Sequence, residues 1–279
     1  MRITEQAHAK VNLVLRVGAP RADGLHPLCS IFASLDLADR VTMEPARQDA
    51  VACAGVEGPN LASAAIRLYR ETVPDLPPVR VAIEKRIPVA AGLGGGSADA
   101  AAVLRAADEL SGAQLGVERL RALAADIGSD VPSQVVACHA LVAGVGEVVE
   151  PVALPSMSLV LLPSSQGLST PSVYGELDRL RRGSPPPPAS HLDPEALRER
   201  AEAGLDGLAV GLENDLAQAA ISLRPELAER VDLLLAAGAM AAQITGSGPT
   251  VFGVFGDRKS ADAAAARLED AIVTNVRRC

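Results

Sequence analysis

Aromatic side chains are scarce in this sequence. Its 279 residues include three Phe, two Tyr and no Trp, which together make 2% of the chain. Proteins that read nucleic acid usually combine a basic surface with aromatic rings that stack on bases. This chain instead has 26 Lys and Arg against 34 Asp and Glu, a formal net charge of −8. We therefore expect no nucleic-acid partner, and a core built from Ala, Val, Leu and Ile.

Cysteine is also rare. The four cysteines are scattered and none form a C-x-x-C pair: Cys29, Cys53, Cys138 and Cys279. Disulfide frameworks are typical of short, cysteine-rich secreted chains, which this is not. Charged residues among the first ten positions would interrupt the apolar core of a secretion signal. We therefore expect a protein without disulfides in the reducing cytoplasm.

Long apolar runs are limited to one stretch, residues 233–256, which contains no charge. It holds five glycines and Pro249, whose freed backbone groups would find no partners in lipid. We interpret it as a helix end followed by two buried strands around a tight loop, and expect no membrane partner. A length of 279 residues fits one large domain or two ordinary ones.

The first half of the chain mixes strand and helix patterns. Apolar residues alternate from Val11 to Val17 and from Val79 to Ile83, which predicts two half-buried strands. A helical pattern follows a glycine-rich segment and ends near Gly112, where a C-cap glycine is expected. A second helix is predicted over 117–127, and strands over 131–149. Elements that mix without strict alternation favour an α+β fold.

The second half continues this mixture. Prolines near residue 153 suggest a boundary between two domains, 1–153 and 154–279. Strands are predicted over 158–162, 239–245, 250–255 and 271–276, and a helix over 260–270. Asp193 and Pro194 form a typical helix start, and Pro225 opens another helix with Leu235 facing inward. The run Pro185–Pro188 predicts an exposed extended loop.

The segment from Ala91 to Ser97 carries the strongest chemical signal. Four of its residues are glycines, which allow close backbone approach to a ligand. If Ser97 opens a helix, unpaired N–H groups and the helix dipole there favour an anion such as phosphate. The alternative is a tight turn. A Walker loop is excluded because no lysine precedes Ser97, and a dinucleotide fold is disfavoured because helix, not strand, follows.

Other residues could carry chemistry or be ordinary structural residues. Asp130 lies between a predicted helix and strand, where it could point into a cleft or simply cap a turn. Lys10 and Asn12 share one face of the first strand, which could be a site or a solvated face. A lone His26 is more often structural. The Gly246–Pro249 segment is either a hairpin turn or a second close-approach loop.

Together these segments resemble the GHMP small-molecule kinase superfamily. The similarity rests on the first strand, the glycine loop and a late loop: Ala9-Lys-Val-Asn-Leu13, Pro88–Ala101 and Ile244-Thr-Gly-Ser-Gly-Pro-Thr250. Further matching segments are Arg21–His26, Gly128–Pro132, Gly144–Glu147, Thr170–Tyr174 and Asn214-Asp215. The segment that ends in His26, with Lys10 and Asn12, points to a member that acts on a cytidine diphosphate-linked methylerythritol in non-mevalonate isoprenoid synthesis.

The resemblance implies an N-terminal domain like the second domain of ribosomal protein S5 and a ferredoxin-like C-terminal domain. It implies transfer of phosphate from ATP, with Mg²⁺, to the 2-hydroxyl of that substrate. Asp130 and Lys10 would be catalytic. ATP-binding positions would be Asn60, Lys85, Pro88, Val89, Ala90, Ala91, Gly92, Leu93, Gly94, Gly95, Gly96, Ser97 and Ala98. Substrate-binding positions would be Asn12, Leu25, His26, Thr170 and Tyr174. Ser97 is the expected protein contact of Mg²⁺.

The sequence departs from the family at the base-binding end. Leu25 stands where the family generally has tyrosine, and Ser133-Gln134 and Cys138 replace usual residues. A missing ring bears on base stacking, which is worth about 1–3 kcal/mol per base. Two other functions remain as alternatives to the one that the resemblance implies. The chain could be another GHMP kinase, acting on homoserine, mevalonate or a sugar, or an inactive nucleotide-binding sensor. We expect a monomer or weak homodimer.

Overall fold

The computed structural model describes residues 1–54, 60–164 and 166–279 and divides into two compact units. Unit 1 consists of Met1–Ala9, Leu37–Val89 and Gly94–Cys138. Unit 2 consists of Lys10–Asp36, Ala90–Leu93 and His139–Cys279. Each unit is built from three separate segments of the chain. The two consecutive domains expected from the sequence, 1–153 and 154–279, stay a prediction.

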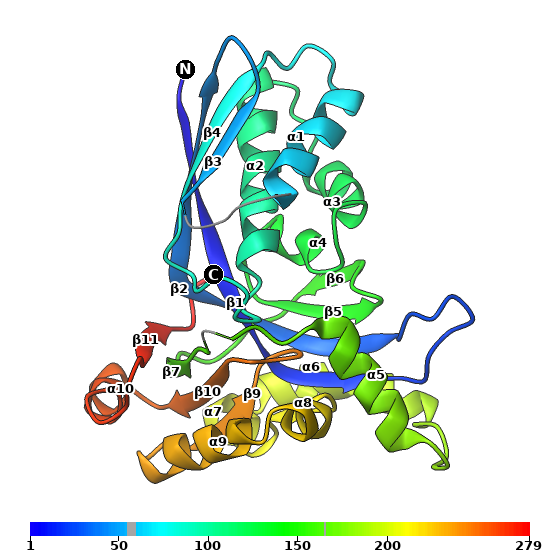
Figure 1. Ribbon diagram of the computed structural model, residues 1–279, viewed down its shortest axis with the longest axis vertical. Coiled ribbons are helices and arrows are strands. Elements are labelled where there is room, and N and C mark those ends of the chain that lie inside the picture. Colours follow the sequence, from blue (N-terminus) through cyan, green and yellow to red (C-terminus); the bar gives the residue numbers. More distant parts are fainter. Residues whose placement is uncertain (55–59, 165) are drawn as a thin grey trace. The chain divides into compact units, whose positions relative to one another are not determined.

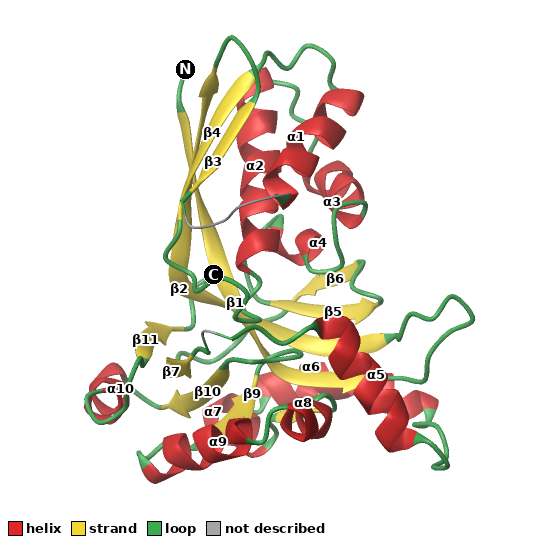
Figure 2. Ribbon diagram, in the orientation of Figure 1, coloured by secondary structure: helices red, strands yellow, loops and turns green. Residues whose placement is uncertain are grey.

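In unit 1 helices cover one face of a sheet (Figures 1 and 2). The strands are β1 (Ile3–Val17), β2 (Leu28–Pro45), β3 (Ala50–Cys53) and β4 (Val79–Glu84), in the order β3-β4-β2-β1. β2 and β4 are antiparallel, and β3 and β4 are parallel. The helices are α1 (Leu61–Thr72), α2 (Gly95–Ser111), α3 (Val117–Ala125) and α4 (Val131–Gln134).

The core of unit 1 follows from its sequence pattern. β4 buries alternate residues, which confirms the predicted half-buried strand. The buried face of α2 is mostly alanine, which allows a neighbouring helix to pack closely, and the largest buried side chain on that neighbour is Tyr69 of α1. Its hydroxyl donates to Asp108 Oδ1 at 2.9 Å, so one of the two tyrosines is used in the core.

Unit 2 combines the remaining parts of β1 and β2 with a second sheet. β5 (Ala140–Gly144) pairs with β2 and with β6 (Val148–Pro151), and β8 (Glu213–Asn214) is parallel to β1. The second sheet is antiparallel, with β7 (Ser158–Leu162), β9 (Ala241–Ile244), β10 (Val251–Phe255) and β11 (Ile272–Asn275) in the order β11-β7-β10-β9. The helical segments are α5 (Thr170–Arg181), η1 (Ala189–Leu192), α6 (Pro194–Glu202), α7 (Gly204–Val210), α8 (Ala217–Leu223), α9 (Glu226–Ala236) and α10 (Arg258–Ala265).

The α+β class is confirmed, as are the strands of the second sheet and the helix start at Asp193, whose side chain accepts from Glu195 N. The uncharged stretch 233–256 is a helix end and two strands, and no helix among the described residues is long and apolar enough to cross a membrane. Gly112 is the C-cap of α2, with φ +70°.

Several expectations were wrong. Residues 131–134 form α4 instead of a strand, and the predicted helix over 260–270 ends at Ala265. The middle of β1 is buried on both faces rather than one, and Leu235 is 44% exposed instead of inward. Cys29 and Cys53 are free, whereas Cys138 and Cys279 are disulfide-bonded, so the expectation of a chain without disulfides is also wrong.

Candidate functional site

Three segments of unit 2 meet at the glycine-rich loop. Lys10 N of β1 donates to Leu93 O at 3.0 Å. Thr250, at the end of the β9–β10 hairpin loop, donates to Ala91 O through its Oγ1 at 2.7 Å and through its N at 3.3 Å. The backbone of Ala91–Leu93 is therefore held from both sides, by β1 and by the hairpin loop.

Gly92 shows why this junction requires glycine. Its φ is +78°, and a Cβ added to it would lie 2.4 Å from Gly248 O. Ala90, two residues earlier, also has a positive φ, +57°, which is rare for a residue with a side chain. Gly246–Pro249 is thus both a hairpin turn and a loop that approaches another backbone closely. The tight-turn alternative for the glycine segment does not account for this contact.

The start of α2 in unit 1 completes the glycine segment. The helix begins at Gly95, with Gly94 as its left-handed N-cap, so the expectation that Ser97 opens the helix was wrong by two residues. A Cβ on the exposed Gly96 would meet only Leu61 Cδ1, at 3.8 Å. Ser97 is half-buried, and its hydroxyl makes no hydrogen bond within the described ranges. The first N–H groups of a 17-residue helix and an available hydroxyl suit an anion and its counter-ion.

Lys10 and Asn12 do not lie on a solvated strand face, because they are 4% and 2% exposed. Lys10 Nζ donates to Asn12 Oδ1 at 2.8 Å and lies 4.7 Å from the centre of the Phe32 ring. Asn12 N donates to Thr245 Oγ1 at 2.9 Å, and Asn12 Nδ2 donates to Ser30 Oγ at 2.9 Å. The ammonium group is therefore held by a buried amide whose own position is fixed.

Asn214 fixes the hairpin loop from the opposite side. Its Nδ2 donates to Ile244 O at 2.7 Å and to Gly246 O at 2.9 Å, and its Oδ1 accepts from Leu216 N at 2.9 Å. Sequence reasoning assigned Asn214 no role, although the pair Asn214-Asp215 was among the matching segments. Thr245, completely buried, was likewise not predicted.

Asp130 belongs to unit 1 and occupies the N-cap position of α4. Its side chain makes no capping hydrogen bond, so the alternative of an ordinary capping aspartate does not hold. The Ser133 hydroxyl instead donates to the backbone O of Asp130 at 2.8 Å. The carboxylate of Asp130 is thus half-buried and is not used for capping.

Lys85 is held by two buried carboxylates in unit 1. Its Nζ donates to Asp99 Oδ2 at 2.8 Å and to Asp39, and Asp39 Oδ1 also accepts from Ile87 N. Burial raises the pKa of Asp99 to about 6, and Asp99 Oδ1 has no hydrogen-bond partner among the described residues. Asn60 caps α1, since its Oδ1 accepts from Ala62 N at 2.8 Å. Both predicted adenine-side residues therefore already have structural partners.

The predicted base-binding residues gather beside α5 in unit 2. The His26 and Tyr174 rings lie 5.0 Å apart at 46°, and His26 Nε2 lies 2.8 Å from Asp178 Oδ1. Thr170 Oγ1 is hydrogen-bonded to Ser247 Oγ at 2.9 Å. Leu25 is 53% exposed. The structure thus brings His26 and Tyr174 together, and adds Asp178, which the sequence did not predict.

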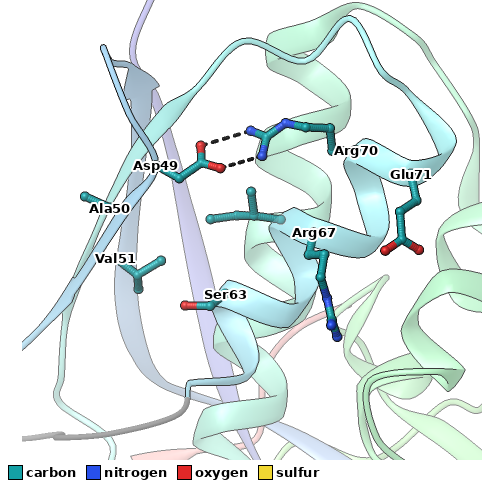
Figure 3. Close-up of a pocket in the computed structure, with 8 residues that line it drawn as sticks. Asp49, Ala50, Val51, Ser63, Arg67, Arg70 and Glu71 are labelled. Atoms are coloured by element: carbon teal, nitrogen blue, oxygen red, sulfur yellow. Dashed lines mark hydrogen bonds and ion pairs between the residues drawn. The ribbon is translucent and has the colours of Figure 1, made fainter.

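A pocket of about 420 Å³ lies between β3 and α1 in unit 1 (Figure 3). An Arg70–Asp49 ion pair lies beside it, and Arg67 and Glu71 of α1 line its surface. No predicted site residue lines this pocket.

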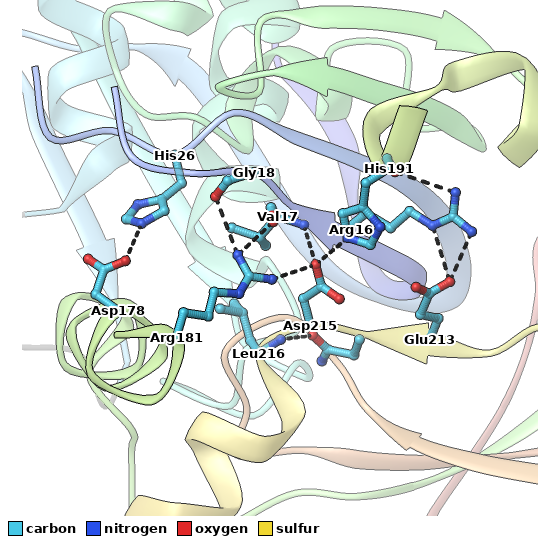
Figure 4. A network of polar contacts seen from close by, with 11 residues as sticks. Arg16, Val17, Gly18, His26, Asp178, Arg181, His191, Glu213, Asp215 and Leu216 are labelled. Carbon is cyan, nitrogen blue, oxygen red and sulfur yellow. Dashed lines mark hydrogen bonds and ion pairs between the residues drawn. The ribbon is translucent and has the colours of Figure 1, made fainter. Parts of the chain in front are cut away.

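His191, Glu213 and Asp215 bring possible metal-ligand atoms within 4.8 Å of one another. Their carboxylates already have cationic partners, however (Figure 4). Arg16 and Arg200 bind Glu213 at 3.1 and 3.0 Å. Asp215 Oδ2 accepts from His191, from Arg181 and from Val17 N. Arginine keeps its charge at all ordinary pH values, so this cluster is an ion-pair network rather than a metal centre.

Comparisons with known proteins agree over nearly the whole chain. The model described as GHMP kinases N terminal domain matches residues 60–139, and that described as GHMP kinases C terminal matches residues 192–273. A 4-diphosphocytidyl-2-C-methyl-D-erythritol kinase of Streptomyces avermitilis is 40% identical over 278 residues, covering 96% of this chain and 93% of that protein.

Solved structures give the same result. The crystal structure of a 4-(cytidine 5'-diphospho)-2C-methyl-D-erythritol kinase is 37% identical, with a TM-score of 0.81 and 98% of both chains covered. L. major mevalonate kinase in complex with R-mevalonate has a TM-score of 0.70 at 16% identity, covering 99% of this chain and 97% of that chain. At that identity the likeness concerns the fold alone.

Proposed function

Because the chain belongs to the GHMP kinases, and within them to the 4-diphosphocytidyl-2-C-methyl-D-erythritol kinase family, we propose that it phosphorylates that substrate with ATP. The acceptor is the 2-hydroxyl group, and the reaction is a step of non-mevalonate isoprenoid synthesis. The observation that carries the proposal is the backbone bond between Lys10 and Leu93, which joins a buried lysine to the glycine loop. The GHMP kinase fold predicted from the sequence is confirmed by the same relatives.

In this proposal the segment from Pro88 to Ala98 holds the ATP phosphates. Gly92 lets the loop pass close to the backbone of Gly248, and Gly96 leaves the backbone at the start of α2 open to a ligand. The N–H groups at the start of α2 provide a positive dipole end. Asn60 and Lys85 lie on the adenine side. Mg²⁺, when bound, would neutralise charge on the phosphate oxygens, and the Ser97 hydroxyl, which has no hydrogen-bond partner among the described residues, would suit its shell of oxygen ligands.

Asp130 and Lys10 carry the chemistry. Phosphoryl transfer passes through a loose transition state, so positioning and charge stabilisation matter most. The 2-hydroxyl oxygen forms a bond to the γ-phosphorus while the bond to the β-bridging oxygen breaks and ADP leaves. Asp130 accepts the hydroxyl proton. Lys10, fixed by Asn12, supplies positive charge to the developing negative charge.

The cytidine end lies against His26 and Tyr174. Asn12 faces the substrate chain, Thr170 extends the contact from the first residue of α5, and Leu25 supplies an apolar edge. A cytoplasmic location and a monomeric or weakly dimeric state belong to the same proposal.

The deciding experiment compares different acceptor substrates and removes the general base, Asp130. We expect ATP-dependent phosphorylation of the cytidine substrate, and in Asp130→Ala a loss of transfer of at least about 100-fold, the contribution of one general base. ATP binding, measured by calorimetry, should be nearly unchanged. Asp126→Ala, which removes an exposed carboxylate in the same segment, is the matched control and should keep full activity.

Three results would contradict the proposal. Faster turnover of homoserine or mevalonate than of the cytidine substrate would favour another GHMP kinase. Absence of turnover with every acceptor, together with ATP binding, would favour an inactive sensor. An active Asp130→Ala enzyme would remove the role assigned to that residue.

A further inference from the structure

We propose that Asp178 is a positioning residue that holds His26 in the orientation and tautomer that select cytosine over uracil. This inference rests on the proposed function, since it takes the cytidine end of the substrate to lie at His26.

Four residues on one face of α5 contact neighbouring segments. Thr170, Tyr174 and Asp178 follow one another at intervals of four residues, and Arg181 comes three residues later, so all four lie on one side of the helix. Thr170 contacts the β9–β10 loop, Tyr174 and Asp178 contact His26, and Arg181 contacts the end of β1. This face of α5 therefore serves the segment that carries His26.

That segment, residues 18–27, is attached to α5 at two points: His26 contacts Asp178, and Gly18 O accepts from Arg181 Nη1 at 3.4 Å (Figure 4). Arg181 Nη1 donates to Val17 O at 2.8 Å, and Arg181 Nη2 is paired with Asp215 at 2.9 Å. Gly18 N donates to Pro27 O at 2.8 Å, which closes the base of the turn. Arg181 fixes the backbone of the segment, which leaves Asp178 to fix the side chain of His26.

The short contact between His26 and Asp178 determines where the imidazole proton lies. A carboxylate can only accept a hydrogen bond, so Nε2, at 2.8 Å from Asp178 Oδ1, carries a hydrogen. In the neutral ring Nδ1 is then an acceptor. Nδ1 has no hydrogen-bond partner in the part of the chain that the structure describes. The ring is 6% exposed and lies against Tyr174, so it has little freedom to turn.

An acceptor at this position distinguishes the two pyrimidines. Cytosine presents an exocyclic amine donor at N4, whereas uracil presents a carbonyl acceptor at the corresponding position. Two acceptors facing each other leave both unpaired, and an unpaired polar group in a partly buried site costs affinity. Leu25 has no ring to stack on the base, so this hydrogen bond takes a larger share of base recognition.

The experiment measures binding of cytidine diphosphate and uridine diphosphate by calorimetry, apart from turnover. Wild type should bind the cytidine nucleotide more tightly. Asp178→Ala should weaken that binding about fivefold, the size of one net hydrogen bond, and should not weaken uridine diphosphate binding. Asp178→Asn should keep most of the preference, because its amide oxygen can still accept from Nε2.

Two controls separate positioning from a general structural effect. Glu176→Ala removes a carboxylate from the same helix that is paired with Arg179 rather than His26, and should change neither affinity. In a His26→Ala background, Asp178→Ala should have no further effect on cytidine diphosphate binding. For turnover, Asp178→Ala should raise the KM of the cytidine substrate while kcat stays constant.

The outcomes are separable. Two results would overturn the role of Asp178 even if the enzyme phosphorylates its substrate normally. One is an equal loss of affinity for both nucleotides in Asp178→Ala. The other is that Asp178→Ala weakens cytidine diphosphate binding as much in the His26→Ala background as in wild type. If wild type does not phosphorylate the cytidine substrate, the proposed function fails instead. Preference for cytidine diphosphate that disappears in Asp178→Ala alone supports the inference.

Discussion

Substitution of Gly92 by alanine tests whether the close approach of two loops forms the phosphate site. The positive φ of +78° costs about 1–2 kcal/mol in a residue with a Cβ. The new Cβ would lie 2.4 Å from Gly248 O, whereas ordinary contacts lie at about 3.5 Å. One of the loops must therefore move by about 1 Å, because the obstacle is backbone and cannot rotate away.

A displacement of this size should reduce activity strongly. Misplacement of reacting groups by about 1 Å can cost about 100-fold. If the glycine loop moves, Leu93 O, which accepts from Lys10 N, is displaced. If the hairpin loop moves, Thr250, which donates to Ala91 O, is displaced. Either movement disturbs the phosphate site. We expect kcat/KM for ATP to fall about 100-fold in Gly92→Ala, with folding verified by circular dichroism.

Gly112→Ala is the matched control. Gly112 has a similar φ, +70°, but no atom lies within 4 Å of its added Cβ. Gly112→Ala should lose only the stability that a positive φ costs a residue with a Cβ, with a Tm lower by about 2–4 °C and unchanged kcat/KM. A folded Gly92→Ala enzyme with wild-type kcat/KM would refute the assignment of this junction to the phosphate site. Equal losses of activity in the two variants would show that backbone strain, not the contact, matters.

Two further predictions concern pH. Burial lowers the pKa of His139, whose Nδ1 accepts from Ser34 N at 3.2 Å. As the pH falls, His139 therefore takes up a proton in the unfolded state before it does so in the folded state, and the free energy of unfolding should fall from pH 7 to pH 5. His139→Gln should flatten this fall in thermal melts, and an unchanged slope would contradict the reasoning. Burial raises the pKa of Asp99 to about 6, so its charge costs stability above that pH and the cost disappears as pH falls towards 4. Asp99→Asn should therefore raise Tm relative to wild type more at pH 8 than at pH 5; equal differences at both pH values would count against it.

Local patterns in the sequence predicted local structure well. The alternation in β4, the cap at Asp193 and the hairpin of β9 and β10 are each set by neighbouring residues, and each was found as expected. Sequence patterns did not predict structure correctly where buried residues do not recur at a strand or helix period. The middle of β1 is buried on both faces, and the 18 residues of β2 were not recognised as one strand. α4 has four residues and includes Pro132, too few for a helical period.

The candidate site was predictable where it lies in one segment. The glycine loop was found from its composition, and resemblance supplied Lys10, Asp130 and His26. Contacts that join distant segments left no pattern in the sequence, such as His26 with Asp178, which are 152 residues apart. Such pairs could only be found once the fold had placed α5 beside the turn after β1.

The two long strands have a consequence for how this protein can change. β1 and β2 each contribute to both compact units, and the chain crosses between the units after Ala9, Asp36, Val89, Leu93 and Cys138. No single cut in the gene separates one unit from the other. A half-gene exchanged with a relative at the middle of the chain would give unit 2 strands from one parent and a second sheet from the other. Successful recombination should therefore require that these strands and the segments they pair with be inherited together.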